Sequence, residues 1–541
     1  MRTLFHSMSH SLVRSSFPPM TLDALPIELL HKVIAFLDID DVLTLRQVSP
    51  YLDASTYDNR SWKRIYSSSR FPRPPLPSAD HSRDTLERIL RQSSAVHRNM
   101  IVAPKLSSTR AIQVSGDRSP LLLGGRWLLT RSPKQILCRD LDASPAAEGD
   151  RFPPSVIYQP ENGSVGAFTC AEVTGYDGKH HAFIVFIERT TSLSVVVLQM
   201  QGGCNASLHR PYFKEIYRRQ GPSRFVTTEW DPPSVVEAII SPSALLITWS
   251  SSRYRYVILD IDTSQEVRRS PEGVVVPPQL DNIEDHPQVD ACVPPECFSQ
   301  SYSLTSSHLL VVRTYTETTA SEGRSEKTRI DATPLAALIG AERTPPSASF
   351  GVVDGTLRNL RLLRDSAVDL ETGMSSVFVL ASRENESRLP DSPPTLVAAR
   401  LLIPSAASTA PISIQLIEIE GMSDFTSSSL VVPPSVNGST RILYSDEGTP
   451  WHPKFEVGAL AVVHDEDTGA VRCTANTVAS SVRFFGGLEA ENKRWSLVDA
   501  DPIRGRVCFV EDELNRRARR NSIISMVHIC DFVEISSPMY T

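Results

Sequence analysis

The sequence predicts an α+β chain in which a small helical module precedes a much larger, mainly-β region. Apolar residues recur with a helical period only within about the first hundred residues. From about residue 110 onward they form short β-branched and aromatic runs separated by Gly, Pro, Ser and Asp. The 40 prolines among 541 residues argue against a chain of long helices, because proline costs about 3 kcal/mol inside a helix.

Residues 1–19 are expected to form a disordered extension. They combine many serines with Arg2 and Arg14 and contain no acidic residue. Apolar residues on one side of a helix would also fit a mitochondrial presequence, which stays open as an alternative. Translation that begins at Met20 is a further alternative.

The helical module is predicted from its apolar spacing and its capping residues. Segment 25–37 has apolar residues at 25, 29, 30, 33, 34 and 37, which form one broad stripe along a helix. Pro26 suits the first turn of that helix, where its missing N–H is not needed. The acidic segment 38–41 predicts the cap of a second helix over 42–48, and Ser49-Pro50 predicts the start of a third.

This module carries more apolar surface than it can bury alone. It has about 40 residues, a size at which a single domain rarely builds a sufficient core. Each of its large apolar side chains contributes about 1.5–3 kcal/mol when buried. The sequence therefore predicts that either the rest of the chain or another protein covers part of the module.

A gap-free pattern runs through the first two predicted helices: Leu25-Pro26-x-Glu28-Leu29-Leu30, Val33-Ile34, Leu37, Asp41-Val42-Leu43, Leu45 and Val48-Ser49. This pattern resembles an F-box domain, which we place at residues 20–66, and Trp62 lies where that family often has a closing tryptophan. Ile39 and Pro50-Tyr51 depart from the family's usual proline and basic residues but lie off the apolar stripe. The alternative is a helical subdomain with a purely structural role.

The resemblance implies a partner. F-box domains bind a Skp-type adaptor, which links them to cullin and RING subunits and to a ubiquitin-conjugating enzyme. By this analogy, eleven residues are predicted to form the adaptor interface or the small core behind it: Leu25, Pro26, Leu29, Leu30, Val33, Ile34, Leu37, Val42, Leu43, Leu45 and Val48.

Residues 67–108 are predicted to be a proline-rich spacer followed by a linker helix. Segment 71–77 has four prolines and favours an extended chain. Segment 82–92 favours a helix with Ser82 as its cap and with Leu86, Ile89 and Leu90 on its apolar face. A proline-rich recognition motif for other partners is the alternative interpretation of the spacer.

Residues 109–541 show a recurring strand pattern. Seven apolar runs recur, and the first four steps between them are nearly regular; their marker residues are Trp127, Ile184, Ile247, Val311, Phe378, Leu460 and Phe509. Such a recurrence predicts a propeller-like domain of about seven degenerate blades, with a pair of β-sandwiches as the alternative fold. The signature pairs of true WD repeats are absent. The whole arrangement is similar to fungal F-box proteins with a long β-rich carboxyl-terminal region.

The last predicted strand, segment 522–530, is expected to pair with the first blade and to remove exposed sheet edges. Long loops near residues 265–300 and 318–348 are candidates for recognition, since variable loops on a rigid scaffold often bind partners. Disordered insertion is an equally good interpretation of both loops.

The sequence contains little that points to chemistry. The net charge of −7 gives no reason to expect nucleic-acid binding. No apolar run approaches the roughly 20 residues that span a membrane. His286, Cys292 and Cys297 lie close in sequence, but a zinc ribbon would need a second tight pair, so we expect an ordinary loop and no metal.

We therefore expect a non-catalytic chain without cofactors. It would act in the cytoplasm or nucleus as the subunit of an SCF-type ubiquitin ligase that binds an unknown protein substrate. The alternatives are an F-box scaffold that acts outside ubiquitination and a propeller-type hydrolase or lectin fused to a docking module. Clustered carboxylates in a central channel would favour the enzyme.

Overall fold

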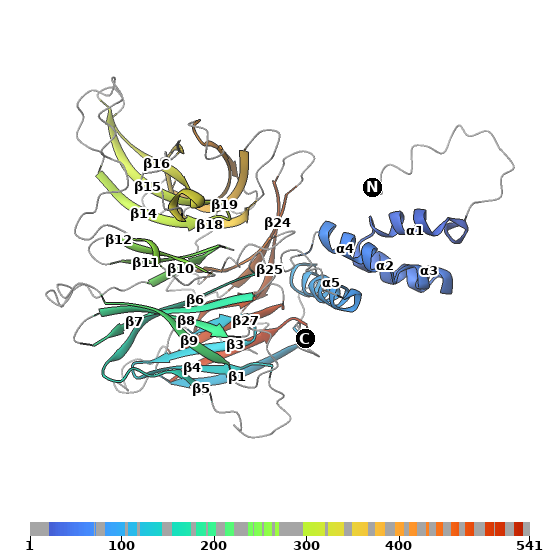
Figure 1. Ribbon diagram of the computed structural model, residues 1–541, viewed down its shortest axis with the longest axis horizontal. Coiled ribbons are helices and arrows are strands. Elements are labelled where there is room, and N and C mark those ends of the chain that lie inside the picture. Colours follow the sequence, from blue (N-terminus) through green and yellow to red (C-terminus); the bar gives the residue numbers. More distant parts are fainter. Residues whose placement is uncertain are drawn as a thin grey trace. The chain divides into compact units, whose positions relative to one another are not determined.

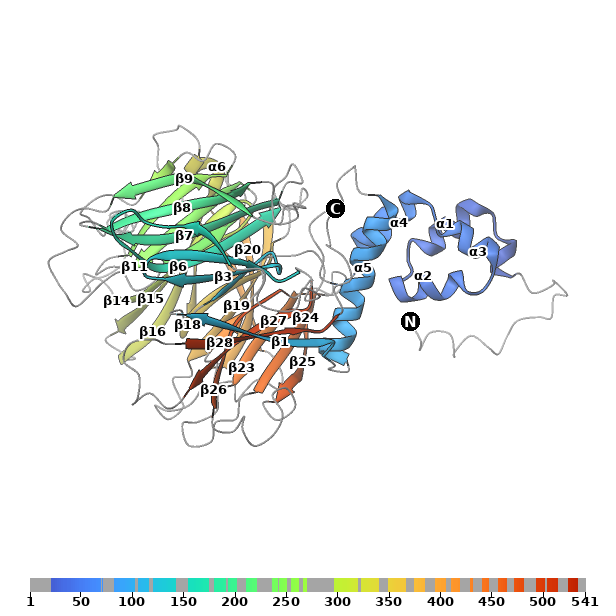
Figure 2. The same ribbon diagram turned by 90° about the horizontal axis from the view of Figure 1, so that it is seen from below.

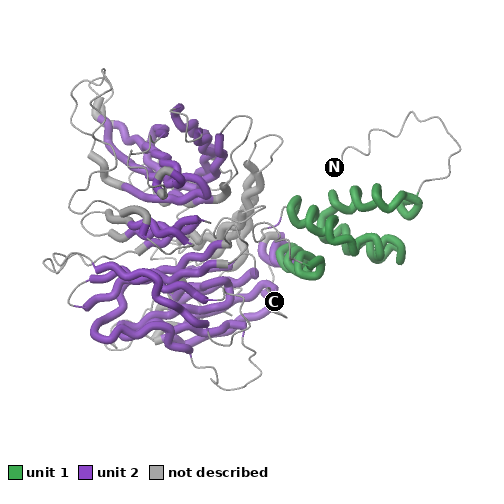
Figure 3. The backbone as a smooth tube through the Cα atoms, viewed as in Figure 1, with its two compact units in different colours: residues 1–69, 77–94 green, residues 70–76, 95–541 purple. Residues whose placement is uncertain are grey.

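The chain folds into two compact units, shown in different colours in Figure 3. Unit 1 comprises residues 1–69 and 77–94, and unit 2 comprises residues 70–76 and 95–541. The computed structural model describes residues 21–69, 71, 82–102, 106–115, 120–142, 154–174, 180–190, 193–201, 211–220, 236–241, 243–250, 254–261, 266–269, 296–319, 323–339, 349–365, 374–384, 395–404, 410–418, 429–431, 440–446, 456–464, 471–480, 493–501, 504–513 and 524–533. The predicted extension at residues 1–19 and the prolines of the predicted spacer lie outside these residues.

Unit 1 is helical, as the sequence predicts. Its elements are η1 (Leu22–Ala24), α1 (Ile27–Ile34), α2 (Ile39–Arg46), α3 (Pro50–Ser55), α4 (Asn59–Ser68) and most of α5 (Arg83–His97).

Capping residues account for the starts of α3 and α5, whereas α2 begins at Ile39, earlier than predicted, and Asp38 at its N-cap makes no side-chain capping bond. The Ser49 hydroxyl accepts the N–H of Leu52 at 3.2 Å, which confirms the predicted start of the third helix. The Ser82 hydroxyl likewise accepts the N–H of Thr85 at 3.3 Å at the start of α5. Pro26 lies one residue before α1 rather than in its first turn, because its carbonyl accepts the first N–H groups of that helix.

The core of unit 1 collects one face from each helix. Leu30 and Ile34 of α1, Leu52 of α3 and Trp62 of α4 are all almost fully buried. Leu86, Ile89 and Leu90 are also buried, so the predicted apolar face of the linker helix is confirmed. Of the six apolar positions predicted along the first helix, only Leu30 and Ile34 are buried.

Unit 2 contains seven four-stranded antiparallel sheets among its described residues (Figure 1). We number them in chain order: sheet 1 has β2 (Leu121–Leu123), β3 (Trp127–Ser132), β4 (Gln135–Asp140) and β5 (Ser155–Tyr158); sheet 2 has β6 (Ser164–Thr174), β7 (His180–Arg189), β8 (Leu193–Gln201) and β9 (Tyr212–Gln220); sheet 3 has β10 (Val236–Ile240), β11 (Ala244–Ser250), β12 (Tyr254–Asp260) and β13 (Glu266–Arg269); sheet 4 has β14 (Glu296–Leu304), β15 (His308–Thr319), β16 (Gly323–Pro334) and β17 (Ser349–Asp354). Sheet 5 has β18 (Thr356–Asp365), β19 (Met374–Glu384), β20 (Thr395–Pro404) and β21 (Ser413–Glu418); sheet 6 has β22 (Ser429–Val431), β23 (Thr440–Asp446), β24 (Glu456–His464) and β25 (Val471–Ser480); sheet 7 has β26 (Lys493–Asp501), β27 (Arg506–Glu513), β28 (Ile524–Asp531) and β1 (Ser108–Ser115). Two short helices, η2 (Arg98–Val102) and α6 (Leu335–Ile339), complete the unit.

Among the described residues, five pairs of neighbouring sheets pack face to face. Apolar clusters join sheet 1 to sheet 2, sheet 2 to sheet 3, sheet 3 to sheet 4, and sheet 4 to sheet 5. A further cluster joins sheet 7 to sheet 1. In β7, for example, Ile184 and Phe186 face sheet 1, whereas Phe183 and Val185 face sheet 3. Both faces of such a strand are buried, which explains why its sequence is a continuous apolar run rather than an alternating one.

The first strands of the sheets also follow one another in space. Strand β2 contacts β6, β6 contacts β10, β10 contacts β14 and β14 contacts β18. Strand β22 contacts β26, and β26 contacts β2, so the last sheet returns to the first.

The recurrence in the sequence corresponds to one repeated structural position. Six of the seven marker residues lie in the second strand of their sheet, for example Trp127 in β3 and Phe509 in β27. Leu460 is the exception, since it lies in the third strand of sheet 6. The near-regular steps therefore reflect the return of a central, doubly buried strand.

The last strand forms as predicted, but it pairs with β1 in sheet 7 and not with a strand of sheet 1, where the first blade was expected. Strand β28 lies antiparallel to β1, with Ser108 opposite Asp531 and Ser115 opposite Ile524 (Figure 2). Sheet 7 thus combines the beginning and the end of unit 2. This pairing covers one edge of β28, which would otherwise offer unpaired N–H and C=O groups.

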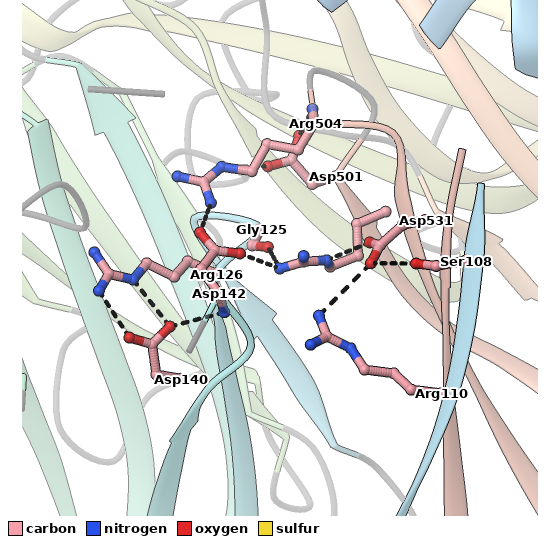
Figure 4. A network of polar contacts seen from close by, with 10 residues as sticks. Ser108, Arg110, Gly125, Arg126, Asp140, Asp142, Asp501, Arg504 and Asp531 are labelled. Atoms are coloured by element: carbon pink, nitrogen blue, oxygen red, sulfur yellow. Dashed lines mark hydrogen bonds and ion pairs between the residues drawn. The ribbon is translucent and has the colours of Figure 1, made fainter. Parts of the chain in front are cut away.

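A buried polar network lies where sheet 7 meets sheet 1 (Figure 4). The Arg506 guanidinium, which is 1% exposed, donates to Asp531 Oδ1 at 2.6 Å, to Asp142 Oδ1 at 3.0 Å and to the Gly125 carbonyl at 2.5 Å. Arg504 donates to the other oxygen of Asp142 at 2.8 Å. Gly125 has a left-handed φ of 59°, and a Cβ at this position would collide with the Asp501 carboxylate. The network therefore joins segments from the two ends of unit 2.

Candidate docking surface

Helix α1 has two apolar faces, and only one of them is covered. Leu30 and Ile34 lie in the core of unit 1 and are fully buried. On the adjacent side, Leu29 and Val33 are 46% and 37% exposed, and Phe36, just after the helix, is 90% exposed. Positions 29, 33 and 36 follow the i, i+4, i+7 spacing that places side chains in a row along one side of a helix. We call these three residues the outer stripe.

The eleven predicted site residues divide between surface and core. Four are exposed, namely Pro26, Leu29, Val33 and Val48; three are partly buried, namely Leu25, Leu37 and Leu43; four are buried, namely Leu30, Ile34, Val42 and Leu45. The exposed members are available to a partner without rearrangement, whereas the buried members form the support behind them. Their assignment to adaptor binding stays a prediction.

Two exposed apolar residues on or directly after α1 were missing from the prediction. Ile27 is 37% exposed, and Phe36 is the most exposed large apolar side chain described in unit 1. Phe36 lies directly after the end of α1, and its N–H donates to the Val33 carbonyl at 3.0 Å. The seven-residue spacing between Leu29 and Phe36 could have predicted a shared helix side. The predicted stripe was broad and included Leu37 in place of Phe36.

Polar contacts hold the helices that carry this surface. The Trp62 indole N–H donates to the Thr56 carbonyl at 2.6 Å, and the Tyr51 hydroxyl donates to the Leu25 carbonyl at 3.3 Å. Ser61 donates both its N–H and its hydroxyl to the Asp58 carboxylate, which caps α4. The outer stripe therefore projects from a tightly connected helical support.

The described part of unit 2 contains a cluster of carboxylates, the feature that would favour an enzyme. Asp499 and Asp501 of β26 lie near Glu172 of β6, and burial together with these two charges raises the pKa of Glu172 to about 8. Burial also raises the pKa of Asp499 to about 6. However, Asp499 accepts the N–H of Leu122 at 2.8 Å, and Glu172 accepts that of Gly124. Asp499 and Glu172 thus bind backbone N–H groups of β2 and of the turn after it, and Asp501 accepts the N–H of Arg504 at 3.0 Å.

The remaining candidate features give no site in the described part of the chain. No three His, Cys, Asp or Glu side chains there gather closely enough to hold a metal ion. His286 and Cys292 lie outside the described residues. Of the helices that the structure describes, none is long and apolar enough to cross a membrane.

Comparison with known families identifies the module that carries the outer stripe. A family model described as F-box-like matches residues 22–68, which comprise η1 and helices α1 to α4. The chain thus has an F-box-like domain followed by a region of β-sheets. Among curated proteins, none matches this sequence.

Solved structures resemble the chain only weakly. The WD40 domain of SCAP from fission yeast is similar over 78% of this chain and 86% of its own length, with 10% identity and a TM-score of 0.34. Domains 1-2 of the Drosophila Semaphorin 1a extracellular region are similar over 80% of this chain and 89% of their own length, with 9% identity and a TM-score of 0.34. An α-L-arabinanase from Penicillium chrysogenum is similar over 68% of this chain and 94% of its own length, with 11% identity and a TM-score of 0.29. Similarities of this size assign no function to the chain.

Proposed function

From the F-box-like domain at residues 22–68, we propose that this chain is the substrate-recognition subunit of an SCF-type ubiquitin ligase. The observation that carries the proposal is the outer stripe, an uncovered apolar row on a helix whose other face is locked in a core. An exposed helical row of this kind fits an apolar groove on a partner, here a Skp-type adaptor. The adaptor would link the chain to cullin and RING subunits.

The chain would contribute proximity rather than chemistry. In this arrangement unit 1 binds the adaptor and unit 2 binds a protein substrate, so that the substrate lies near a ubiquitin-conjugating enzyme. Holding two reactants together converts a bimolecular step into an effectively unimolecular one. Asp499 and Glu172 each accept a backbone N–H of the chain itself. This bonding supports a non-catalytic role better than a hydrolase.

For unit 2 we propose a seven-bladed propeller-like fold. Support comes from the seven four-stranded sheets, from the succession of their first strands and from the pairing of β1 with β28. Two β-sandwiches would leave one face of each sheet uncovered. Sheets 1, 2, 3 and 4 instead each bury both faces against two neighbouring sheets. The rigid body would present its connecting loops to the substrate.

The test is adaptor binding by the full chain with Leu29→Asp and Val33→Asp together. Both side chains are exposed, so the variant is expected to fold, whereas two charges in an apolar interface should abolish binding. Central apolar anchors typically contribute about 2 kcal/mol or more each, so we expect at least a 100-fold weaker Kd for a purified Skp-type adaptor. The matched control is Val352→Asp, an exposed valine on β17 of unit 2.

The outcomes separate the possibilities. Unchanged binding by the double variant would contradict the assignment of the interface, and a wild-type chain that does not bind the adaptor would contradict the proposal itself. Recovery of cullin together with the adaptor from cells is expected for a ligase subunit, and adaptor without cullin is expected for a scaffold outside ubiquitination. We also propose a cytoplasmic or nuclear location, which fluorescence microscopy of the tagged chain would test.

A further inference from the structure

We propose that α5 is an obligatory part of the adaptor-docking module and that the ion pair between Arg46 and Glu87 is its positioning contact. This inference rests on the proposed docking function. The F-box-like match ends at residue 68, and α5 begins at Arg83, so this helix lies outside the matched segment. Nevertheless its first twelve residues belong to unit 1.

The first observation is a bidentate ion pair between α5 and the end of α2. Arg46 Nη1 donates to Glu87 Oε1 at 2.7 Å, and Arg46 Nη2 donates to Glu87 Oε2 at 2.9 Å. The two side chains are only 16% and 12% exposed. A planar guanidinium that meets a carboxylate through two parallel hydrogen bonds fixes orientation as well as distance.

The second observation is a contact at the opposite end of α2. The Ser94 hydroxyl donates to Asp40 Oδ2 at 2.9 Å. Asp40 precedes Arg46 by six residues on α2, and Ser94 follows Glu87 by seven residues on α5. At a rise of about 1.5 Å per residue, these separations correspond to about 9 Å and about 10.5 Å. The two helices therefore run antiparallel and are connected at both ends of α2.

The third observation is the apolar face of α5. Leu86, Ile89 and Leu90 are fully buried, so this face of the helix is removed from water, which favours the packed position of α5. Polar contacts at both ends of α2, together with this buried apolar face, attach α5 to the helices of unit 1.

Arg46 extends this support toward the outer stripe. Its Nε donates to the Thr56 hydroxyl at 2.7 Å, and its guanidinium lies 5.4 Å from the centre of the Trp62 ring. Trp62 belongs to α4, which contacts α1. Contacts therefore lead from Glu87 through Arg46 and Trp62 to the helix that carries Leu29 and Val33. Glu87 would affect docking by holding this support in place and without contacting the adaptor.

The experiment measures adaptor binding to the full chain by isothermal titration calorimetry. Glu87→Gln keeps the side-chain size but removes the charge, and we expect a 5- to 20-fold weaker Kd with unchanged stoichiometry. Arg46→Met should weaken binding at least as much, because Arg46 also donates to Thr56 and lies against Trp62. The double variant should bind no more weakly than Arg46→Met alone, because Glu87 acts through Arg46. Asp84→Asn is the matched control on the same helix; its carboxylate is 75% exposed, and we expect less than a twofold change.

Each outcome decides the question. A wild-type Kd for Glu87→Gln would overturn the inference, and so would a reduced stoichiometry with an unchanged Kd, since that result means partial unfolding alone. If Glu87→Gln does not fold, Ser94→Ala replaces it, with an expected two- to fivefold weaker Kd, and a wild-type Kd would again overturn the inference. Absence of binding by the wild-type chain would overturn the proposed function as well.

Discussion

Replacement of Arg506 by methionine should open the junction between the two ends of unit 2. The Arg506 side chain is almost fully buried and forms hydrogen bonds with Asp531, Asp142 and the Gly125 carbonyl. Asp531 lies at the end of β28, whereas Gly125 follows β2. A methionine fills similar space but offers no donor, so both carboxylates lose a charged partner in a buried position.

The magnitude follows from the partners that remain. Removing one partner of a buried ion pair typically costs about 3–5 kcal/mol. Asp531 keeps the Ser108 hydroxyl at 3.3 Å and the more distant Arg110 at 3.6 Å, and Asp142 keeps Arg504 at 2.8 Å. We therefore expect the lower end, about 3 kcal/mol, which corresponds to an increase of about 150-fold in the local opening equilibrium.

Hydrogen exchange at individual backbone amides is the appropriate assay, because it reports local opening. The amides of β1 and β28 should exchange faster in Arg506→Met, with smaller changes in sheets 3 and 4. Adding Asp531→Asn should recover part of the loss, since it removes an uncompensated carboxylate. The control Lys327→Met removes a partly exposed ion pair with Glu317 on sheet 4 and should cost about 1 kcal/mol or less. Unchanged exchange in β1 and β28, or an equal effect of the control, would refute the reasoning.

Two further predictions concern the two units separately. The pKa of Glu172 is raised to about 8 in the folded chain, so its contribution to stability is present in full below its ordinary pKa and is lost as the pH rises toward 8. Glu172→Gln should therefore have a larger free energy of unfolding in urea than wild type at pH 8, by about 4 kcal/mol, and a value within about 1 kcal/mol of wild type at pH 5; a constant difference across this range would contradict the sign. In unit 1, Trp62→Ala removes a fully buried ring and its hydrogen bond to Thr56, so we expect a loss of about 3–5 kcal/mol and rapid proteolysis between residues 21 and 94. Proteolysis at the wild-type rate would show that the ring is dispensable.

Local patterns predicted much of both units because they encode secondary structure directly. The apolar spacing of 25–37 and the cap at Ser49-Pro50 predicted α1 and the start of α3. In the same way, seven recurring apolar runs predicted seven sheets, and the final run predicted strand β28, which pairs with β1. Leu460 lies in the third strand of its sheet and the other markers in the second, because a run of small and apolar residues does not distinguish two neighbouring central strands.

By itself, the sequence determined that a helical module precedes a repeated β region, and that the first helix has more apolar residues than a core of its size needs. It did not determine which of two adjacent leucines faces a partner. Leu29 and Leu30 are chemically identical, yet one is 46% exposed and the other is fully buried, because packing against α3 and α4 selects one side of the helix. Nor did it determine the contact between Arg506 and Gly125, which are 381 residues apart. Periodicity is a local property of the chain, whereas burial and long-range ion pairing arise only when distant segments pack together.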